Sequence, residues 1–158
     1  ATTAIYTLSL HDALPIWAGG LNMRSASSAN FGPGDIRKIV RIASGNGVKT
    51  YLTINSVLYD SELPAMRQAL DAAREAGVTA AIVADQAAIM YASSIGLPVH
   101  LSTQLSISNT ESLRFYSGWS DVVVLARELS LEQVAAIHQA ILDDDIRGPS
   151  GRDRKSVV

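Results

Sequence analysis

The stretch VKTYLTINSVLYDSELPAMRQALDAAREAGVTAAIVAD, residues 48–85, decides the fold. It opens with Val48–Asn55, a run rich in β-branched and aromatic residues that predicts a strand. Ser61–Gly77 follows with apolar residues at helical spacing, Ser61 suiting an N-cap and Gly77 a C-cap. Thr79–Asp85 is a second strand-forming run. A strand, a helix and a strand at this spacing predict a right-handed βαβ unit with parallel strands.

The same alternation continues on both sides of this stretch. A helix is expected near Asp35–Ser44, and two further strands at Val99–Ile107 and Asp121–Ala126. Two helices are expected between these elements: Gln86–Ile95, closed by Gly96, and a helix capped by Asn109 that runs through Phe115. A last helix begins with a capping box of Ser130 and Gln133. It carries one stripe made of Leu131, Val134, His138 and Ile141.

Two of the expected strands carry one polar face, which distinguishes between two parallel architectures. Strands of an open doubly wound sheet are covered on both faces and read as nearly continuous apolar runs. A polar face indicates a barrel lumen with a site at its mouth. The sequence therefore predicts an α/β fold, a partial (β/α) TIM-type barrel of about four parallel strands alternating with helices, with a doubly wound sheet as the alternative. The polar positions are Tyr51, Thr53 and Asn55 on one strand and His100, Ser102 and Gln104 on the other.

Composition excludes several classes of function. The chain has 158 residues, 13 basic and 15 acidic, with a formal net charge of -2. That balance gives no electrostatic footprint for nucleic acid or an anionic membrane surface. Cysteine is absent, so no disulfide or thiolate nucleophile is available here. No apolar run approaches the ~20 residues that a membrane helix needs, and no secretory signal precedes the core. A cytoplasmic enzyme core with no membrane partner is expected.

The two ends read as non-native sequence. ATTAIYTLSLHDALPI, residues 1–16, can be translated from a sequencing-library adapter, with Glu in place of Ala4. The closing DRKSVV, residues 153–158, reads as the same adapter on the opposite strand, and the next adapter codon is a stop. We therefore expect a core domain of residues 17–152 between two adapter-derived ends. The alternative is a natural N-terminal arm.

Polar residues close each expected strand at its carboxyl end, where barrel active sites lie. Asn55, Asp85 and Gln104 occupy three of these ends, and Arg127 with Glu128 occupies the fourth. Arg127 could grip a carboxylate or phosphate through its planar fork. The alternative is an ion pair of Arg127 with Asp85 or Glu128 that closes the barrel top. Loop hydrogen bonding is an equal alternative for Asn55 and Gln104.

A long loop, residues 19–31, follows the place where a first barrel strand would end. It holds Arg24 and Asn30, and long loops at that face tend to carry function. His100 is expected to be a core histidine and His138 to pack or face solvent. No histidine or acidic spacing matches a metal site, and no phosphate-binding loop or nucleophile elbow occurs.

Four motifs in order resemble one family. GGLNMRSASSANF (residues 19–31), VKTYLTINSVLYDSEL (48–63), VHLSTQLSISN (99–109) and DVVVLARELSLEQV (121–134) are similar to the N-terminal barrel half of the U32 peptidases, or collagenase-like proteases. The family's histidine- and cysteine-containing signature does not appear, so the resemblance implies an internal fragment of a longer protein. It also implies that the barrel mouth is lined by Arg24, Asn30, Asn55, Gln104, Arg127 and Glu128. Asp85 joins these candidate substrate-binding residues because it lies at an expected strand end. The catalytic residues cannot be assigned from the sequence.

The resemblance implies three expectations about activity. The parent protein is expected to act in hydroxylating a pyrimidine in tRNA or rRNA, with prephenate, a small anionic metabolite, as a required partner. The alternative is a collagenase-like protease acting on a peptide. This fragment alone is expected to be inactive and to hold no cofactor, because the family's iron–sulfur cluster is bound by cysteines that are absent here.

Overall fold

The computed structural model describes residues 13–17, 21, 33–151 and 155–157. These residues fall into two compact units, one ending at Val99 and the other beginning at His100. We call them the N-terminal unit and the C-terminal unit and describe each by itself. Arg24 and Asn30 lie outside the described residues.

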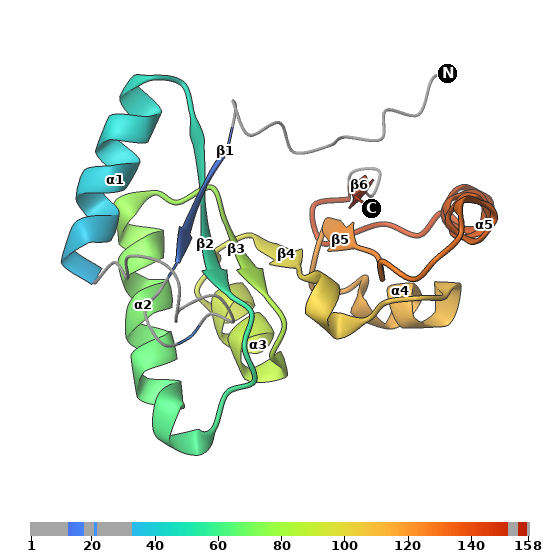
Figure 1. Cartoon of the computed structure of the whole chain (residues 1–158), viewed down its shortest axis with the longest axis horizontal. Helices are drawn as coiled ribbons and strands as arrows, with labels where there is room; N and C mark the ends of the chain where they lie inside the picture. The colour runs from blue at the N-terminus through green and yellow to red at the C-terminus, as the bar shows by residue number, and fades with distance from the viewer. Residues whose placement is uncertain (1–12, 18–20, 22–32, 152–154, 158) are drawn as a thin grey trace. The chain divides into compact units, whose positions relative to one another are not determined.

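The N-terminal unit is a parallel sheet with its helices in chain order (Figure 1). Its strands pair in parallel as β1-β2-β3, with Trp17 opposite Thr53 and Ile54 opposite Val83. Helices α1 and α2 lie side by side along these strands. The elements are β1 (Ala13–Trp17), α1 (Pro33–Gly45), β2 (Lys49–Ile54), the short 3-10 helix η1 (Asp60–Glu62), α2 (Leu63–Ala76), β3 (Ala80–Val83) and α3 (Gln86–Ser94).

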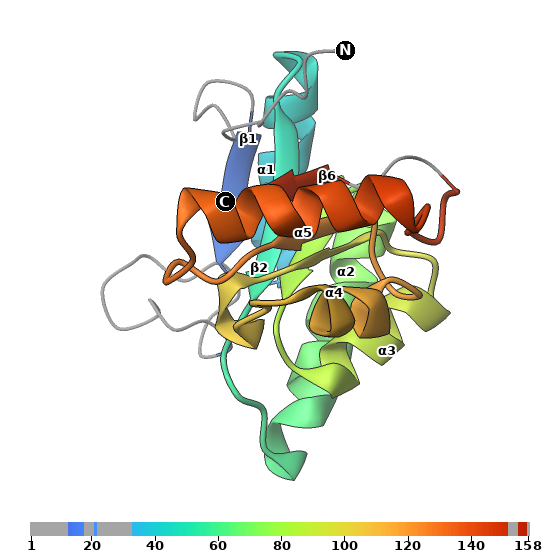
Figure 2. The ribbon, with the colours of Figure 1, turned by 90° about the vertical axis from the view of Figure 1, so that its right-hand side faces the viewer.

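The C-terminal unit repeats this arrangement with shorter strands. Its strands pair in parallel as β4-β5-β6, with His100 opposite Val122 and Val123 opposite Ser156. Helices α4 and α5 contact each other (Figure 2). The elements are β4 (Val99–Leu101, which begins at the boundary), the 3-10 helix η2 (Thr103–Leu105), α4 (Thr110–Tyr116), β5 (Val122–Val124), α5 (Leu131–Asp143) and β6 (Lys155–Val157).

The predicted α/β class with parallel strands alternating with helices is confirmed. Within each unit the strand order follows the chain and never reverses. A doubly wound sheet reverses its order at a switch point, whereas a (β/α) barrel adds each strand beside the last. The strand order within each unit agrees with the predicted partial barrel.

Strands β1 and β6 extend into the segments predicted to be adapter-derived. Parallel pairing is made by backbone groups, which every residue carries except for the missing N–H of proline. A strand can therefore form in a segment of either origin. The assignment of residues 1–16 and 153–158 as non-native stays a prediction.

Burial explains why these segments form these elements. Leu52 and Ile54 of β2, Leu70 of α2 and Val83 of β3 are fully buried, and Leu101 and Val123 are their counterparts in the C-terminal unit. Gly77 closes α2 at φ +81°, a left-handed conformation that glycine adopts without strain. Asn109 accepts a hydrogen bond from the Ser112 N–H at 2.9 Å and caps α4 as predicted. The capping box of Ser130 and Gln133 at the start of α5 is also confirmed.

Two local predictions were wrong. Ser61 does not cap α2, because η1 intervenes and α2 begins at Leu63 with Pro64 in its first turn. The strand predicted through Ile107 ends at Leu101, because the Ser102 hydroxyl accepts a hydrogen bond from the Gln104 N–H and starts η2. In the predicted stripe of α5, Leu131 is 84% exposed, whereas Ile141 is buried together with Ile137.

Candidate functional site at the carboxyl ends of the strands

In the N-terminal unit, Asn55 and Asp85 follow neighbouring strands. Asn55 comes directly after β2, and Asp85 comes two residues after β3. Because Ile54 lies opposite Val83 in the parallel register, both residues stand at the same edge of the sheet. This edge is where ligands bind in parallel α/β folds.

The Asp85 carboxylate joins two loops at this edge. Its Oδ1 accepts a hydrogen bond from the Ala87 N–H at 2.8 Å and caps α3. Its Oδ2 accepts a longer hydrogen bond, 3.4 Å, from the Leu58 N–H in the loop after β2. Both oxygens therefore hold backbone groups of the protein, so the geometry gives Asp85 a positioning role.

The loop after β2 presents two apolar side chains to solvent. Val57 is 74% exposed and Tyr59 is 71% exposed. The backbone beneath them is fixed, because the Tyr59 N–H donates to Glu62 Oε2 and the Glu62 N–H donates to the Tyr59 carbonyl, both at 2.8 Å. Neither residue was predicted from the sequence. The signal in the sequence was an apolar and aromatic run between the end of a strand and the start of a helix.

In the C-terminal unit, the carboxyl end of β4 turns into η2. Ser102 is buried, whereas the Gln104 side chain is exposed. Ser106 closes this turn at φ +51°, a left-handed conformation that is uncommon for a residue with a Cβ. His100, Ser102 and Gln104 therefore do not form one polar strand face, and Gln104 stands beyond the strand end.

Arg127 and Glu128 lie in the turn after β5, and both side chains are exposed. The Ala126 N–H donates to the Ile107 carbonyl at 2.9 Å, which ties this turn to the segment after β4. Within the described part of this unit, the ion pairs involve other arginines, and none joins Arg127 to Glu128. The alternative pair of Arg127 with Asp85 would join the two units and stays a hypothesis.

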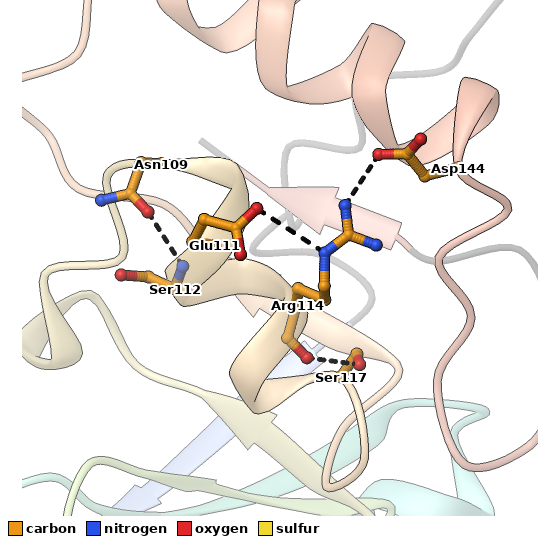
Figure 3. Close-up of polar contacts among 6 residues, drawn as sticks. All are labelled: Asn109, Glu111, Ser112, Arg114, Ser117 and Asp144. Atoms are coloured by element: carbon orange, nitrogen blue, oxygen red, sulfur yellow. Dashed lines mark hydrogen bonds and ion pairs between the residues drawn. The ribbon is translucent and has the colours of Figure 1, made fainter.

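Arg114 shows what a structural arginine looks like in this unit (Figure 3). Its guanidinium donates to Asp144 at the end of α5 at 2.7 Å and pairs with Glu111 at 3.8 Å. The hydrogen bond to Asp144 raises the pKa of Arg114 above its ordinary value. Arg114 thereby links α4 to α5, whereas no ion pair of Arg127 occurs among the described residues.

Cofactor ligands are not evident in the described part of the chain. No group of three His, Asp or Glu side chains that could hold a metal ion occurs among the described residues. The sequence contains no cysteine, so an iron–sulfur cluster does not fit these residues. His100 on β4 and His138 on α5 are both half-buried and engaged in interactions. Among the described helices, none is long and apolar enough to cross a membrane.

Comparison with known proteins identifies the family. The model of Peptidase family U32 matches residues 9–146. This chain belongs to peptidase family U32. The recognition of the family from four sequence motifs is thereby confirmed.

Relatives within the U32 family carry two kinds of activity in their names. A collagenase of Porphyromonas gingivalis is 55% identical to this chain over 132 residues, which are 84% of this chain and 32% of that protein. The 23S rRNA 5-hydroxycytidine C2501 synthase of Escherichia coli is 35% identical over 133 residues, which are 83% of this chain and 20% of that enzyme. This chain thus spans a third or less of these two relatives.

A solved U32 peptidase structure shares the fold. The similarity has a TM-score of 0.64 at 19% identity and covers 81% of this chain and 56% of that chain. At this identity the likeness shows the fold alone. It agrees with the parallel winding seen in each unit.

Proposed function

We propose that this chain is part of a longer U32 protein that hydroxylates a pyrimidine in tRNA or rRNA. The observation that carries the proposal is the 35% identity to an Escherichia coli enzyme named as a hydroxycytidine synthase. The chain covers 20% of that enzyme, so we assign the activity to the longer protein. Its RNA substrate would place that protein in the cytoplasm.

We further propose prephenate as the small anionic partner. Arg127 is exposed beyond β5 and forms no ion pair with the neighbouring Glu128. A guanidinium in this state can bind a carboxylate through two parallel hydrogen bonds. In the same unit, Gln104 offers an amide beyond the next strand. From the sequence alone, we also propose Asn55, Arg24 and Asn30 as substrate-binding residues.

Peptide-bond hydrolysis is the second candidate. It is favoured by the 55% identity to the Porphyromonas gingivalis protein named as a collagenase. The described residues hold no three-residue metal cluster and the sequence has no cysteine nucleophile, so neither a metalloprotease nor a cysteine protease mechanism is supported by them. RNA hydroxylation remains our proposal for the parent, and we propose that this chain alone is inactive.

The test measures hydroxylated pyrimidine nucleosides by mass spectrometry in total tRNA and rRNA. It compares wild-type cells, cells lacking the native locus and cells unable to make prephenate. We expect the same nucleoside to disappear from both mutants. Unchanged nucleosides together with loss of collagen-degrading activity in the deletion strain would establish the protease instead.

The proposed fragment status has a separate test. Sequencing the locus from genomic DNA should show a reading frame that departs from residues 1–16 and 153–158 and continues beyond Arg152 into a cysteine-containing signature. Native codons for ATTAIYTLSLHDALPI at that locus would refute the adapter origin.

A further inference from the structure

The loop after β2, residues 55–59, is an ordered surface at the sheet edge where a substrate would bind. Two carboxylates hold its backbone: Asp85 accepts from the Leu58 N–H at 3.4 Å and Glu62 accepts from the Tyr59 N–H at 2.8 Å. The bond to Glu62 has the length of a strong charge-assisted hydrogen bond, whereas the bond to Asp85 is longer and weaker. The loop is therefore fixed before any ligand arrives.

The side chains that this fixed loop presents are apolar. Tyr59 is 71% exposed, and its neighbour Val57 is 74% exposed. Most large apolar side chains of this unit are buried in the core. Because the backbone of Tyr59 is fixed and a tyrosine side chain has few rotatable bonds, little entropy is lost when a flat partner covers the ring.

We infer that Tyr59 stacks on a nucleobase of the RNA substrate and that Asp85 is the residue that positions it. This inference rests on the proposed RNA-hydroxylating function. Proteins that recognise single-stranded RNA commonly stack splayed bases on aromatic side chains. Asp85 acts through the loop, since both of its oxygens are engaged by backbone N–H groups.

The charges around Tyr59 favour a base over a phosphate as its contact. Asp60 follows it directly and is exposed, and Glu62 lies one helical turn on. Carboxylates here repel the phosphodiester backbone but leave the uncharged face of a base free to stack. The phosphates would be held elsewhere on the parent protein.

The experiment measures binding of the full-length protein to unmodified RNA purified from the deletion strain, at one fixed salt concentration. Tyr59→Leu removes the ring and should weaken RNA binding about tenfold, within the range of a lost base–aromatic stack. Tyr59→Phe keeps the ring and should bind within about twofold of wild type. Phe115→Leu is the matched control, because Phe115 is 72% exposed on α4 of the other unit, and it should bind as wild type.

The role of Asp85 is tested by a double-mutant cycle. Asn has one side-chain oxygen, so Asp85→Asn can keep the bond to Ala87 and lose the bond to Leu58. We expect Asp85→Asn to weaken RNA binding in the wild-type background and to add little in the Tyr59→Leu background, because residues that act through one another are not additive. A purely structural Asp85 would lower binding equally in both backgrounds.

The outcomes separate the inference from the function on which it rests. Wild-type binding by Tyr59→Leu, or an equal loss in Phe115→Leu, would overturn the stacking role while RNA hydroxylation stands. Unchanged hydroxylated nucleosides in the deletion strain would overturn the function and the inference together. Loss of peptide cleavage in Tyr59→Leu with unchanged RNA binding would overturn the inference and make the loop a peptide-binding surface.

Discussion

Replacing Gly148 with alanine should destabilise the C-terminal unit by forcing a loop away from β5. An added Cβ would lie 2.3 Å from Asp121 Oδ1, 2.7 Å from Asp121 Cα and 2.8 Å from the Ser120 carbonyl oxygen. Two of these three atoms belong to the backbone and cannot rotate aside. Normal van der Waals contact begins near 3.4 Å, so the loop must move by about 1 Å or more, a case of overpacking.

That movement would break the bonds that hold the loop. Asp121 Oδ1 accepts hydrogen bonds from the Ser150 hydroxyl at 2.7 Å and from the Ser150 N–H at 3.2 Å. Overpacking costs about 1–3 kcal/mol, and a hydrogen bond to a charged group contributes about 1.5–3 kcal/mol. Since the two effects share one movement, we expect a total loss of about 2–4 kcal/mol.

Urea denaturation of this chain, followed by circular dichroism, measures the loss. Gly118→Ala is the control, because nothing lies within 4 Å of its added Cβ and its φ is not left-handed. Its midpoint should stay close to that of the unmodified chain. Equal midpoints for Gly148→Ala and Gly118→Ala would refute the packing argument.

Three further predictions follow from named contacts. Arg127→Lys keeps the charge and loses the planar fork. In cells carrying only this variant of the parent, hydroxylated nucleosides should fall at least about tenfold, which corresponds to about 1.4 kcal/mol. Wild-type nucleoside levels would show that Arg127 has a structural role. Ser130→Ala removes the acceptor that holds the Gln133 N–H and should cost about 1 kcal/mol of stability in urea; an unchanged midpoint would show that the cap contributes nothing. The hydrogen bond to Asp71 raises the pKa of the Tyr91 phenol in the folded chain. Between the unfolded and the folded pKa, the phenol is therefore ionised in the unfolded chain and protonated in the folded one. The stability that this bond contributes is lost as the pH rises through the folded pKa. The ultraviolet titration difference between wild type and Tyr91→Phe should therefore fall above the ordinary tyrosine value; a midpoint at that value would contradict the bond.

Elements with strong local signals could be predicted from the sequence. The β-branched run of β2, the Gly77 stop of α2 and the capping box at Ser130 each act through neighbours in the chain. Short-range hydrogen bonds and glycine conformations depend little on distant residues. These elements therefore appear where the sequence places them.

Competing local signals caused the misplaced boundaries. Ser102 follows an apolar strand run, and its hydroxyl can either sit on a strand face or accept a backbone N–H. It accepts the Gln104 N–H at 3.3 Å, which ends β4 early. In α5 the apolar pattern includes both the exposed Leu131 and the buried Ile141, so the pattern alone does not show which residues are buried.

The sequence could place the candidate residues near the ends of strands but could not show their roles. Asn55 and Asp85 lie within two residues of the ends of β2 and β3, whereas Gln104 and Arg127 lie three residues beyond β4 and β5. The bond from Leu58 to Asp85 spans 27 residues, so the spacing of the sequence could not show that Asp85 holds a loop. The exposure of Tyr59 likewise depends on how that loop folds.

Complementation can show whether the parent of this chain hydroxylates RNA. The measurement is the content of hydroxylated pyrimidine nucleosides in tRNA and rRNA from cells lacking the native locus and carrying the full-length gene, this chain alone or an empty vector. We expect the full-length gene to restore the nucleoside and the other two to leave it absent. Equal nucleoside content in all three strains and in wild-type cells would contradict it.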